Sequence, residues 1–265
     1  MIPTQTYGPV RLLVVQPTPF CNLDCDYCYL PDRGDRSRLP LAVLEAAVER
    51  VLESPYFGGE FTLLWHAGEP LMAPIAFYDE ATQRIGRLLE GRGLPASTVV
   101  QSLQTNATTI DGAWCDCFER NGIHVGVSMD GPAFLHDAHR VTRAGLPTHA
   151  AVMRGIDWLA RRRIPFQVIC VLTADALDHA DTIVDFFLQN GIGNVGFNME
   201  ETEGPTPIPA SMGARWGGSC WSSATGPSWP ASGSAAASSP AVSAFGNSTA
   251  SPPLPAARPA WFKPI

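Results

Sequence analysis

The stretch VVQPTPFCNLDCDYCYLPDR, residues 14–33, joins a short apolar run to three closely spaced cysteines. Cys21, Cys25 and Cys28 have the spacing C-x3-C-x2-C. Three thiolates can bind three irons of a four-iron cluster and leave the fourth iron open, whereas clusters with four cysteine ligands usually serve electron transfer or structure. An open iron can bind and activate a small molecule. The loop therefore predicts an iron–sulfur site that carries out chemistry.

The apolar run before the cysteines is the first of several strand-like segments that alternate with helical patterns. Short apolar runs rich in β-branched and aromatic residues predict strands buried on both faces at 12–16, 61–66, 98–104, 124–129, 165–172 and 194–198. Helical patterns occupy 41–53, 74–89, 110–121, 150–162 and 179–189. In the first of these, Leu44 and Val48 share an apolar stripe. Gly122 and Gly191 stand where helix C-terminal caps belong.

Six consecutive βα units imply parallel strands joined by right-handed crossovers. An open doubly wound sheet and a complete or partial barrel both satisfy this pattern. No G-x-G-x-x-G turn follows the first strand, so a dinucleotide-binding sheet has no direct support. The informative residues follow strands one to four, whose ends meet on one face in a barrel. We therefore predict an α/β fold, a partial TIM-like barrel of six βα units over residues 8–204.

The composition of the chain changes after Gly204. Residues 205–265 are dominated by Ala, Ser, Gly and Pro, contain four of the seven tryptophans and show no strand or helix period. Such a segment is predicted to be a low-complexity, disordered tail. Tryptophan is unusual in such tails, which favours an out-of-frame translation of a GC-rich gene over a natural flexible tail. Resequencing of the gene would separate the two alternatives.

The overall charge and hydropathy of the 265-residue chain exclude several functions. The net charge of −7 and the lack of a basic stripe disfavour a nucleic-acid partner. No apolar run approaches the ~18 residues that cross a bilayer, and no signal-peptide pattern is present at the N-terminus. Seven cysteines, an odd number, favour reduced thiols or metal ligation over disulfides. We expect a cytoplasmic protein without a membrane partner.

A C-x3-C-x2-C loop after the first barrel strand resembles the signature of the radical S-adenosylmethionine (SAM) superfamily. The resemblance implies that Cys21, Cys25 and Cys28 hold a [4Fe-4S] cluster whose open iron chelates the amino and carboxylate groups of SAM. Reductive cleavage of SAM gives a 5′-deoxyadenosyl radical that abstracts a substrate hydrogen. Tyr27 matches the family's aromatic residue beside the SAM adenine. A reductant such as flavodoxin or ferredoxin is implied as a partner.

The second motif, FTLLWHAGEPLM at residues 61–72, resembles the family's G-G-E-P motif at the end of strand two. A glycine such as Gly68 lets the backbone approach a ligand closely. By the resemblance, Glu69 is a charge-assisted acceptor for the SAM ammonium group. Ala67 replaces the first glycine of the motif, and we expect this departure to be mild because Ala tolerates most conformations except φ > 0.

Two further motifs end strands three and four. Gln104-Thr105-Asn106 resembles the Q-T-N of the peptide- and protein-modifying branch, whose amides orient SAM or substrate. The run from Ser128 to Pro132, followed by His136-Asp137-Ala138-His139-Arg140, resembles S-h-D-G-P … H-D-x-x-R. The resemblance implies that Ser128 bonds the SAM ribose and that Arg140 binds the SAM carboxylate or the adenosyl hydroxyls. Asp130 is expected to order the turn.

The runs QPTPFCNLDCDYCYLPDR, WHAGEPL and FNMEETEG extend the resemblance to the radical SAM/SPASM peptide maturases. Within them the chain is most similar to the glycine-rich-repeat, cyclophane-forming group, with anaerobic sulfatase-maturating enzymes as relatives. The implied substrate is a ribosomally made precursor peptide that becomes cross-linked at an aromatic side chain. Members of this branch hold auxiliary clusters with further cysteines, whereas only Cys220 lies beyond residue 200 here. We therefore expect no intact SPASM domain.

The sequence leaves several functions open. Three alternatives fit the resemblance. The chain is either the core of a peptide-modifying enzyme, or a protein modifier like the sulfatase maturases, or an inactive truncated remnant. A zinc-binding module is a further alternative, with Cys115, Cys117 or His66 as a remote fourth ligand. A lone histidine such as His66 is more often a hydrogen-bonded core residue than a ligand or base. Production of 5′-deoxyadenosine and metal analysis distinguish these alternatives.

Overall fold

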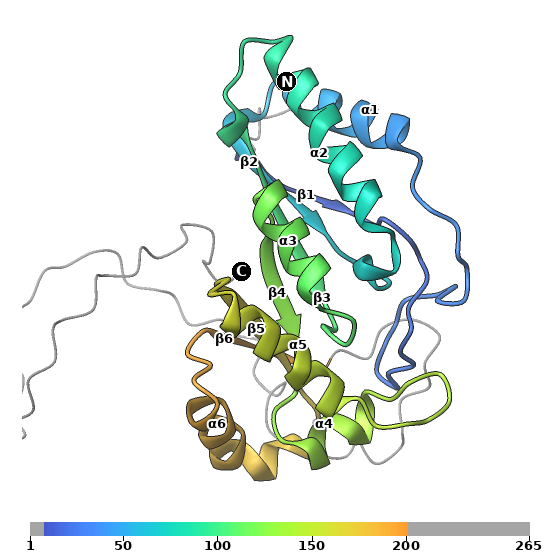
Figure 1. Ribbon diagram of the computed structural model, residues 1–265, viewed down its shortest axis with the longest axis vertical. Coiled ribbons are helices and arrows are strands. Elements are labelled where there is room, and N and C mark those ends of the chain that lie inside the picture. The colour runs from blue at the N-terminus through green and yellow to red at the C-terminus, as the bar shows by residue number, and fades with distance from the viewer. Residues whose placement is uncertain (1–7, 201–265) are drawn as a thin grey trace, which may run out of the picture. The chain divides into compact units, whose positions relative to one another are not determined.

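The computed structural model describes residues 8–200, which form a curled sheet of six parallel strands with helices packed on its outer face (Figure 1). The strands pair in chain order and are β1 (Val10–Val15), β2 (Phe57–Trp65), β3 (Val99–Thr105), β4 (His124–Ser128), β5 (Phe166–Leu172) and β6 (Val195–Met199). Each pairs in parallel with the next, which leaves β1 and β6 as the two edges of the sheet. The predicted partial barrel is confirmed.

The five predicted helices are present, and the structure adds one more. The helices are α1 (Leu41–Leu52), α2 (Ile75–Glu90), α3 (Gly112–Asn121), α4 (Ala133–His139), α5 (His149–Arg161) and α6 (Ala180–Gln189). Three short 3₁₀ turns are η1 (Pro70–Met72), η2 (Ala96–Thr98) and η3 (Ala176–His179). The sequence-based prediction missed α4 because seven residues make only about two turns, too short for an apolar period to show.

The ends of the elements follow local chemistry. Asp111 caps α3 by accepting a hydrogen bond from the Trp114 backbone N–H, and Gly122 ends it in the left-handed region with φ +61°. This confirms the cap predicted at Gly122. Strand β2 begins at Phe57, four residues earlier than predicted. The prediction missed these residues because glycine is typical of turns, whereas Gly58 lies within the strand.

One hydrophobic core lies between the outer face of the sheet and the helices. Its centre is an aromatic cluster in which Trp65 of β2 makes edge-to-face contacts with Phe77 and Tyr78 of α2. The Tyr78 hydroxyl donates to the Pro70 carbonyl at 2.6 Å. The core therefore fixes the turn that immediately follows Glu69, one of the predicted site residues.

The inner, concave face of the sheet is open along β1. Leu12 and Val14 point to this face and are each 51% exposed, whereas Val15, on the opposite face, is buried. Alternate residues of one strand point to opposite faces. The carboxyl ends of the strands border this open face, which places the predicted motifs around it.

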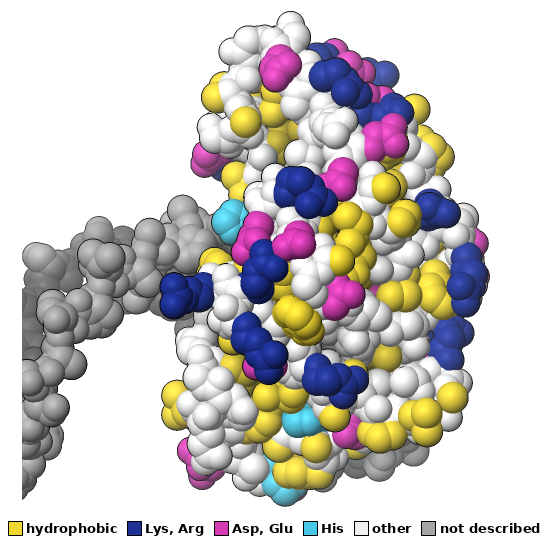
Figure 2. Space-filling view, viewed as in Figure 1, with side chains coloured by type: hydrophobic (Ala, Val, Ile, Leu, Met, Phe, Trp, Pro, Cys, Tyr) yellow, Lys and Arg dark blue, Asp and Glu magenta, His cyan; other side chains and the backbone are white. Residues whose placement is uncertain are grey.

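The tail prediction for residues 205–265 lies outside the described residues. Within residues 8–200, no helix is both long and apolar enough to cross a membrane. The face of the molecule in Figure 2 carries positive and negative side chains interspersed with one another.

Candidate cofactor site

The cysteine loop connects β1 to α1 and is tied to the rest of the chain at both sides of its cysteines. Leu23, between the first two cysteines, is only 1% exposed and anchors the loop. The Arg143 Nε atom donates to the Cys21 carbonyl at 2.9 Å. Arg33 Nη1 donates to the Cys25 carbonyl at 3.2 Å. These contacts hold the loop by its backbone rather than by its thiols.

The three cysteines of the loop are unpaired and half-buried. Burial, followed by the charge of Glu69, raises the pKa of Cys21 to about 12, and burial raises the pKa of Cys25 to about 11. The bare chain therefore holds these two thiols neutral. Bound metal removes such protons, because a coordinating thiol is deprotonated outright.

The residues present fit a cluster better than a single ion. Among residues 8–200, no group of three or more His, Cys, Asp or Glu side chains is placed to hold one metal ion. Cysteines of an iron–sulfur cluster bind different irons and need not converge on one point. Cys21 also accepts a hydrogen bond from the Leu23 backbone N–H at 3.4 Å, which suits a sulfur that becomes negatively charged.

The Ala67-Gly68 turn after β2 is packed against the cysteine loop. Gly68 has φ +63°, and a Cβ atom there would lie 2.3 Å from the Thr18 carbonyl oxygen and 2.8 Å from that of Pro19. Only glycine fits such an approach. Ala67 has φ +70°, in the left-handed region that disfavours L-residues. The expectation of a mild departure at Ala67 is therefore wrong, because this is the conformation that alanine tolerates poorly.

Glu69 is buried, with 1% exposure, and joins the ends of β2 and β3. Its carboxylate accepts hydrogen bonds from the Leu71 backbone N–H at 2.9 Å, the Thr105 hydroxyl at 2.6 Å and the Asn106 backbone N–H at 2.8 Å. Burial raises its pKa, and these three donors oppose that shift. A carboxylate offers about four acceptor positions, so room remains for one more donor.

Gln104 and Ser128 form a polar pair across the ends of β3 and β4. The Gln104 Nε2 atom donates to the Ser128 Oγ atom at 2.9 Å. Gly126 makes room for this pair, because a Cβ atom there would lie 2.1 Å from Gln104 Oε1. Asn106, 7% exposed, lies nearer the cysteine loop and its Nδ2 atom is 4.0 Å from the Cys21 sulfur.

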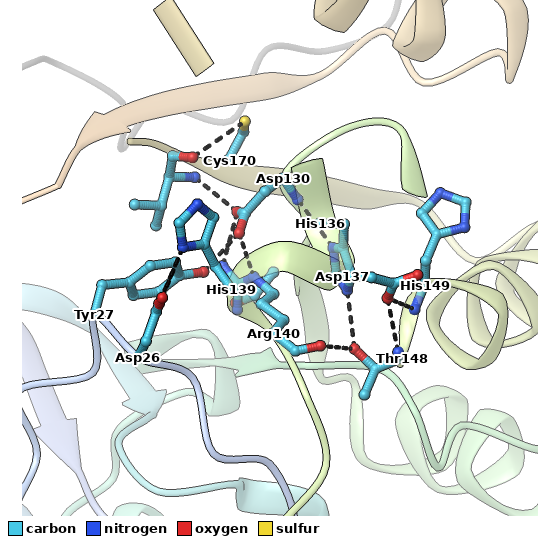
Figure 3. Close-up of polar contacts among 12 residues, drawn as sticks. Asp26, Tyr27, Asp130, His136, Asp137, His139, Arg140, Thr148, His149 and Cys170 are labelled. Carbon is cyan, nitrogen blue, oxygen red and sulfur yellow. Dashed lines mark hydrogen bonds and ion pairs between the residues drawn. The ribbon is translucent and has the colours of Figure 1, made fainter. Parts of the chain in front are cut away.

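Tyr27 and Arg140 meet at Asp130, which follows β4 (Figure 3). The Tyr27 hydroxyl donates to Asp130 at 2.6 Å, and Arg140 donates through Nε at 2.7 Å and Nη2 at 2.9 Å. Burial would raise the pKa of Asp130, but the charge and hydrogen bonds of Arg140 outweigh it and lower the pKa. Asp130 also accepts from the Val171 backbone N–H at 2.9 Å. It thus joins three segments, which goes beyond the turn ordering predicted for it.

His136 and Asp137, which precede Arg140 in the predicted motif, have structural roles. His136 Nδ1 accepts from the Asp130 backbone N–H at 3.3 Å, so its Nε2–H donates to the Thr148 hydroxyl at 3.1 Å. Thr148 donates in turn to the Arg140 carbonyl at 2.6 Å. Asp137 accepts from the backbone N–H groups that begin α5. Figure 3 shows this chain of contacts beside the Asp130 pair.

The structure thus gathers the predicted residues at the carboxyl ends of β1 to β4, in three connected groups. Of the remote zinc ligands considered from sequence, Cys115 and Cys117 lie elsewhere, buried in α3. His66 lies at the carboxyl end of β2, beside the Ala67-Gly68 turn, and is exposed rather than in the core as expected. Sequence reasoning missed Asn22 and Thr108, which contact Asn106. Their only signal was proximity in sequence to the cysteine and Q-T-N motifs.

Known proteins resemble this chain over most of the described core. The model of the Radical SAM superfamily matches residues 15–187, so the chain belongs to the radical SAM superfamily. The cofactors of this superfamily are a [4Fe-4S] cluster and SAM. The relatives of this chain include anaerobic sulfatase-maturating enzymes.

The individual relatives match the same part of the chain. An uncharacterised Synechocystis protein is 50% identical over 198 residues, covering 75% of this chain and 50% of that protein. The serine-type anaerobic sulfatase-maturating enzyme of Klebsiella aerogenes is 34% identical over 199 residues, covering 74% of this chain and 48% of that enzyme. The chain therefore spans about half the length of the curated relatives it matches.

Solved structures show the same core. The structure of native anSMEcpe with bound AdoMet and the Cp18Cys peptide has a TM-score of 0.65 at 28% identity, covering 75% of this chain and 54% of that one. SuiB of Streptococcus suis, solved with its precursor peptide SuiA, has a TM-score of 0.53 at 18% identity, covering 73% of this chain and 40% of that one. The SuiB likeness concerns the fold alone.

Proposed function

We propose that this chain is the core of a radical SAM enzyme that cross-links a ribosomally made precursor peptide. The observation that supports it most directly is the loop of Cys21, Cys25 and Cys28, whose thiols are unpaired and whose backbone is tied to its neighbours. In this proposal the three sulfurs hold the cluster. When bound, the cluster and SAM supply a radical that removes a hydrogen atom from the substrate.

The neighbouring residues take up SAM in this proposal. The backbone at Gly68 and the remaining acceptor position of Glu69 receive the SAM ammonium group. Gln104 and Ser128 present an amide and a hydroxyl from the ends of β3 and β4. Tyr27 and Arg140 border the adenosyl group, with Asp130 holding both side chains in place.

Support for a peptide substrate comes from the named relatives. The anSMEcpe structure, 28% identical to this chain, contains a bound peptide. In the proposed enzyme, the open concave face beside Leu12 and Val14 is available to a substrate. A reductant such as flavodoxin or ferredoxin, in a reducing cytoplasm, supplies the electron. The low-complexity tail predicted for residues 205–265 remains part of this proposal.

A second candidate is modification of a sulfatase, because several relatives are sulfatase-maturating enzymes. The two candidates differ in substrate and product. Tandem mass spectrometry distinguishes a cross-link within a Gly- and aromatic-rich precursor peptide from a change at a serine or cysteine of a sulfatase-derived peptide.

The first test is production of 5′-deoxyadenosine by the full chain, after anaerobic cluster reconstitution, with SAM and dithionite. Release above the background of a Cys25→Ala chain supports the enzyme. A chain with an intact cluster spectrum and no release is instead the inactive remnant. Zinc in place of iron and sulfide contradicts the assignment of the loop.

A further inference from the structure

Beside Cys21, three polar side chains form a closed ring of hydrogen bonds. The Asn106 Nδ2 atom donates to Asn22 Oδ1 at 2.9 Å, and Asn22 Nδ2 donates to Thr108 Oγ1 at 2.9 Å. Thr108 Oγ1 donates back to Asn106 Oδ1 at 2.7 Å. The ring joins the cysteine loop to the segment after β3, across 84 residues of sequence between Asn22 and Asn106.

The ring sets the orientation of the Asn106 amide. The Thr108 backbone N–H, which can only donate, points at Asn106 Oδ1 with an N–O distance of 3.0 Å. The other end of the amide must therefore be Nδ2, and this nitrogen lies 4.0 Å from the Cys21 sulfur. The Leu23 backbone N–H is the second donor to the same sulfur.

The ring also uses all the hydrogen-bonding capacity of the Asn106 side chain. An asparagine amide has two acceptor positions and two donor hydrogens. Oδ1 accepts from the Thr108 N–H and hydroxyl, and Nδ2 donates to Asn22 and towards Cys21. These four contacts leave no group of this amide for SAM or substrate, the two ligands expected from sequence.

We infer that Asn106, held by Asn22 and Thr108, is a positioning residue for Cys21 that tunes the reduction potential of the cluster. This inference rests on the proposed function, because it requires Cys21 to ligate the cluster. Reduction adds negative charge to the cluster and its sulfurs. A donor directed at a ligating sulfur stabilises the reduced form and raises the reduction potential. Removing the donor should therefore make the cluster harder to reduce.

The test uses the full chain, reconstituted anaerobically, and three variants. Asn106→Ala removes the donor, and Thr108→Val keeps the side-chain shape while it breaks the ring. Asn121→Ala is the matched control, because Asn121 Nδ2 also lies 3.5 Å from a cysteine sulfur, that of Cys117 in α3. The measurements are iron and sulfide per chain, the midpoint potential without SAM, and the Kd for SAM.

We expect full iron and sulfide content in each chain and a more negative midpoint potential for Asn106→Ala. Thr108→Val should shift the potential in the same direction by a smaller amount, and Asn121→Ala should leave it unchanged. The Kd for SAM should change less than about twofold in all three variants.

An unchanged potential in a fully loaded Asn106→Ala chain overturns the inference, as does a tenfold weaker SAM affinity with an unchanged potential. If Asn106→Ala takes up no cluster, the potential of Thr108→Val decides, and no shift there overturns the inference. An unsubstituted chain that binds no iron overturns the proposed function itself, and the inference with it.

Discussion

At the scale of single residues, two alanines adopt a conformation that L-residues disfavour. Ala67 has φ +70° and Ala107 has φ +58°. They follow β2 and β3, immediately beside Gly68 and Asn106 respectively. Left-handed backbone costs a non-glycine residue about 1–2 kcal/mol, and such strain often gathers at functional sites. Both alanines thus lie where the chain turns sharply to form the site.

Replacing Ala67 by glycine should stabilise the fold. Relief of the left-handed strain exceeds the added entropy of the unfolded chain, which costs about 0.4–1 kcal/mol, so a net gain of about 0.5–1 kcal/mol is expected. The measurement is urea unfolding of the full chain. The control is Ala46→Gly in the exposed part of α1, which should destabilise by about 1 kcal/mol. Equal destabilisation by both substitutions would contradict the strain at Ala67.

At the scale of elements, α4 carries two histidines in opposite environments. Burial and the charge of Arg140 lower the pKa of His136 to about 4. Hydrogen bonds to Asp26 and Asp175, opposed by burial, raise the pKa of His139 to about 9. One helix therefore contains a histidine that must stay neutral and one that is charged.

His136 should contribute stability that is lost in acid. Its pKa is lower in the folded chain than the ordinary 6.5, so its contribution is complete above pH 6.5 and disappears as the pH falls towards 4. The loss amounts to about 3 kcal/mol. The free energy of unfolding, measured against pH for the wild type and His136→Gln, should converge in acid. A constant difference between the two chains from pH 7 to 4.5 would refute this role.

His139 should behave in the opposite way. Its raised pKa means that its contribution is complete below pH 6.5 and disappears as the pH rises through 9. Because the imidazole is partly exposed, solvent screening limits the effect to about 1 kcal/mol. Urea unfolding of His139→Gln and wild type should differ at pH 6 and agree at pH 10. A difference that grows with pH would be inconsistent with the ion pairs to Asp26 and Asp175.

At the scale of the whole molecule, apolar side chains are exposed near the β6 edge of the described fold. Val184 and Leu188 of α6 are 47% and 66% exposed, and Phe197 and Met199 of β6 are 48% and 44% exposed. Sheet edges with exposed apolar residues promote association. This part of the surface differs from the charged outer sides of α1 and α2, where Arg84 pairs with Glu45 and Glu80.

Placing charge on α6 should reduce self-association. The double variant Val184→Lys and Leu188→Lys substitutes two exposed positions one helical turn apart. Sedimentation velocity should show fewer oligomers, while the free energy of unfolding changes by less than about 0.5 kcal/mol per site. Val43→Lys in α1, at 52% exposure, is the matched control and should leave sedimentation unchanged. Unaltered oligomer content in the double variant would show that this face does not associate.

The fold was largely predictable because its signals are local. Apolar runs such as 61–66 and 165–172 predict buried strands, and helical stripes such as Leu44 and Val48 predict the covering helices. The helix α4 escaped prediction because it is too short to show a period. The conformation of Ala67 escaped because φ depends on how the turn packs against Thr18 and Pro19.

The partial barrel and the loop of three cysteines could be predicted from the sequence alone, because apolar periodicity and motif spacing are visible within a few residues. The tertiary structure alone decides which polar groups meet. Glu69 binds donors of β3, Asp130 joins Tyr27 to Arg140, and Asn106 closes a ring with Asn22. These contacts join segments 10 to 103 residues apart, and they depend on the register and curl of the sheet, which no local pattern encodes.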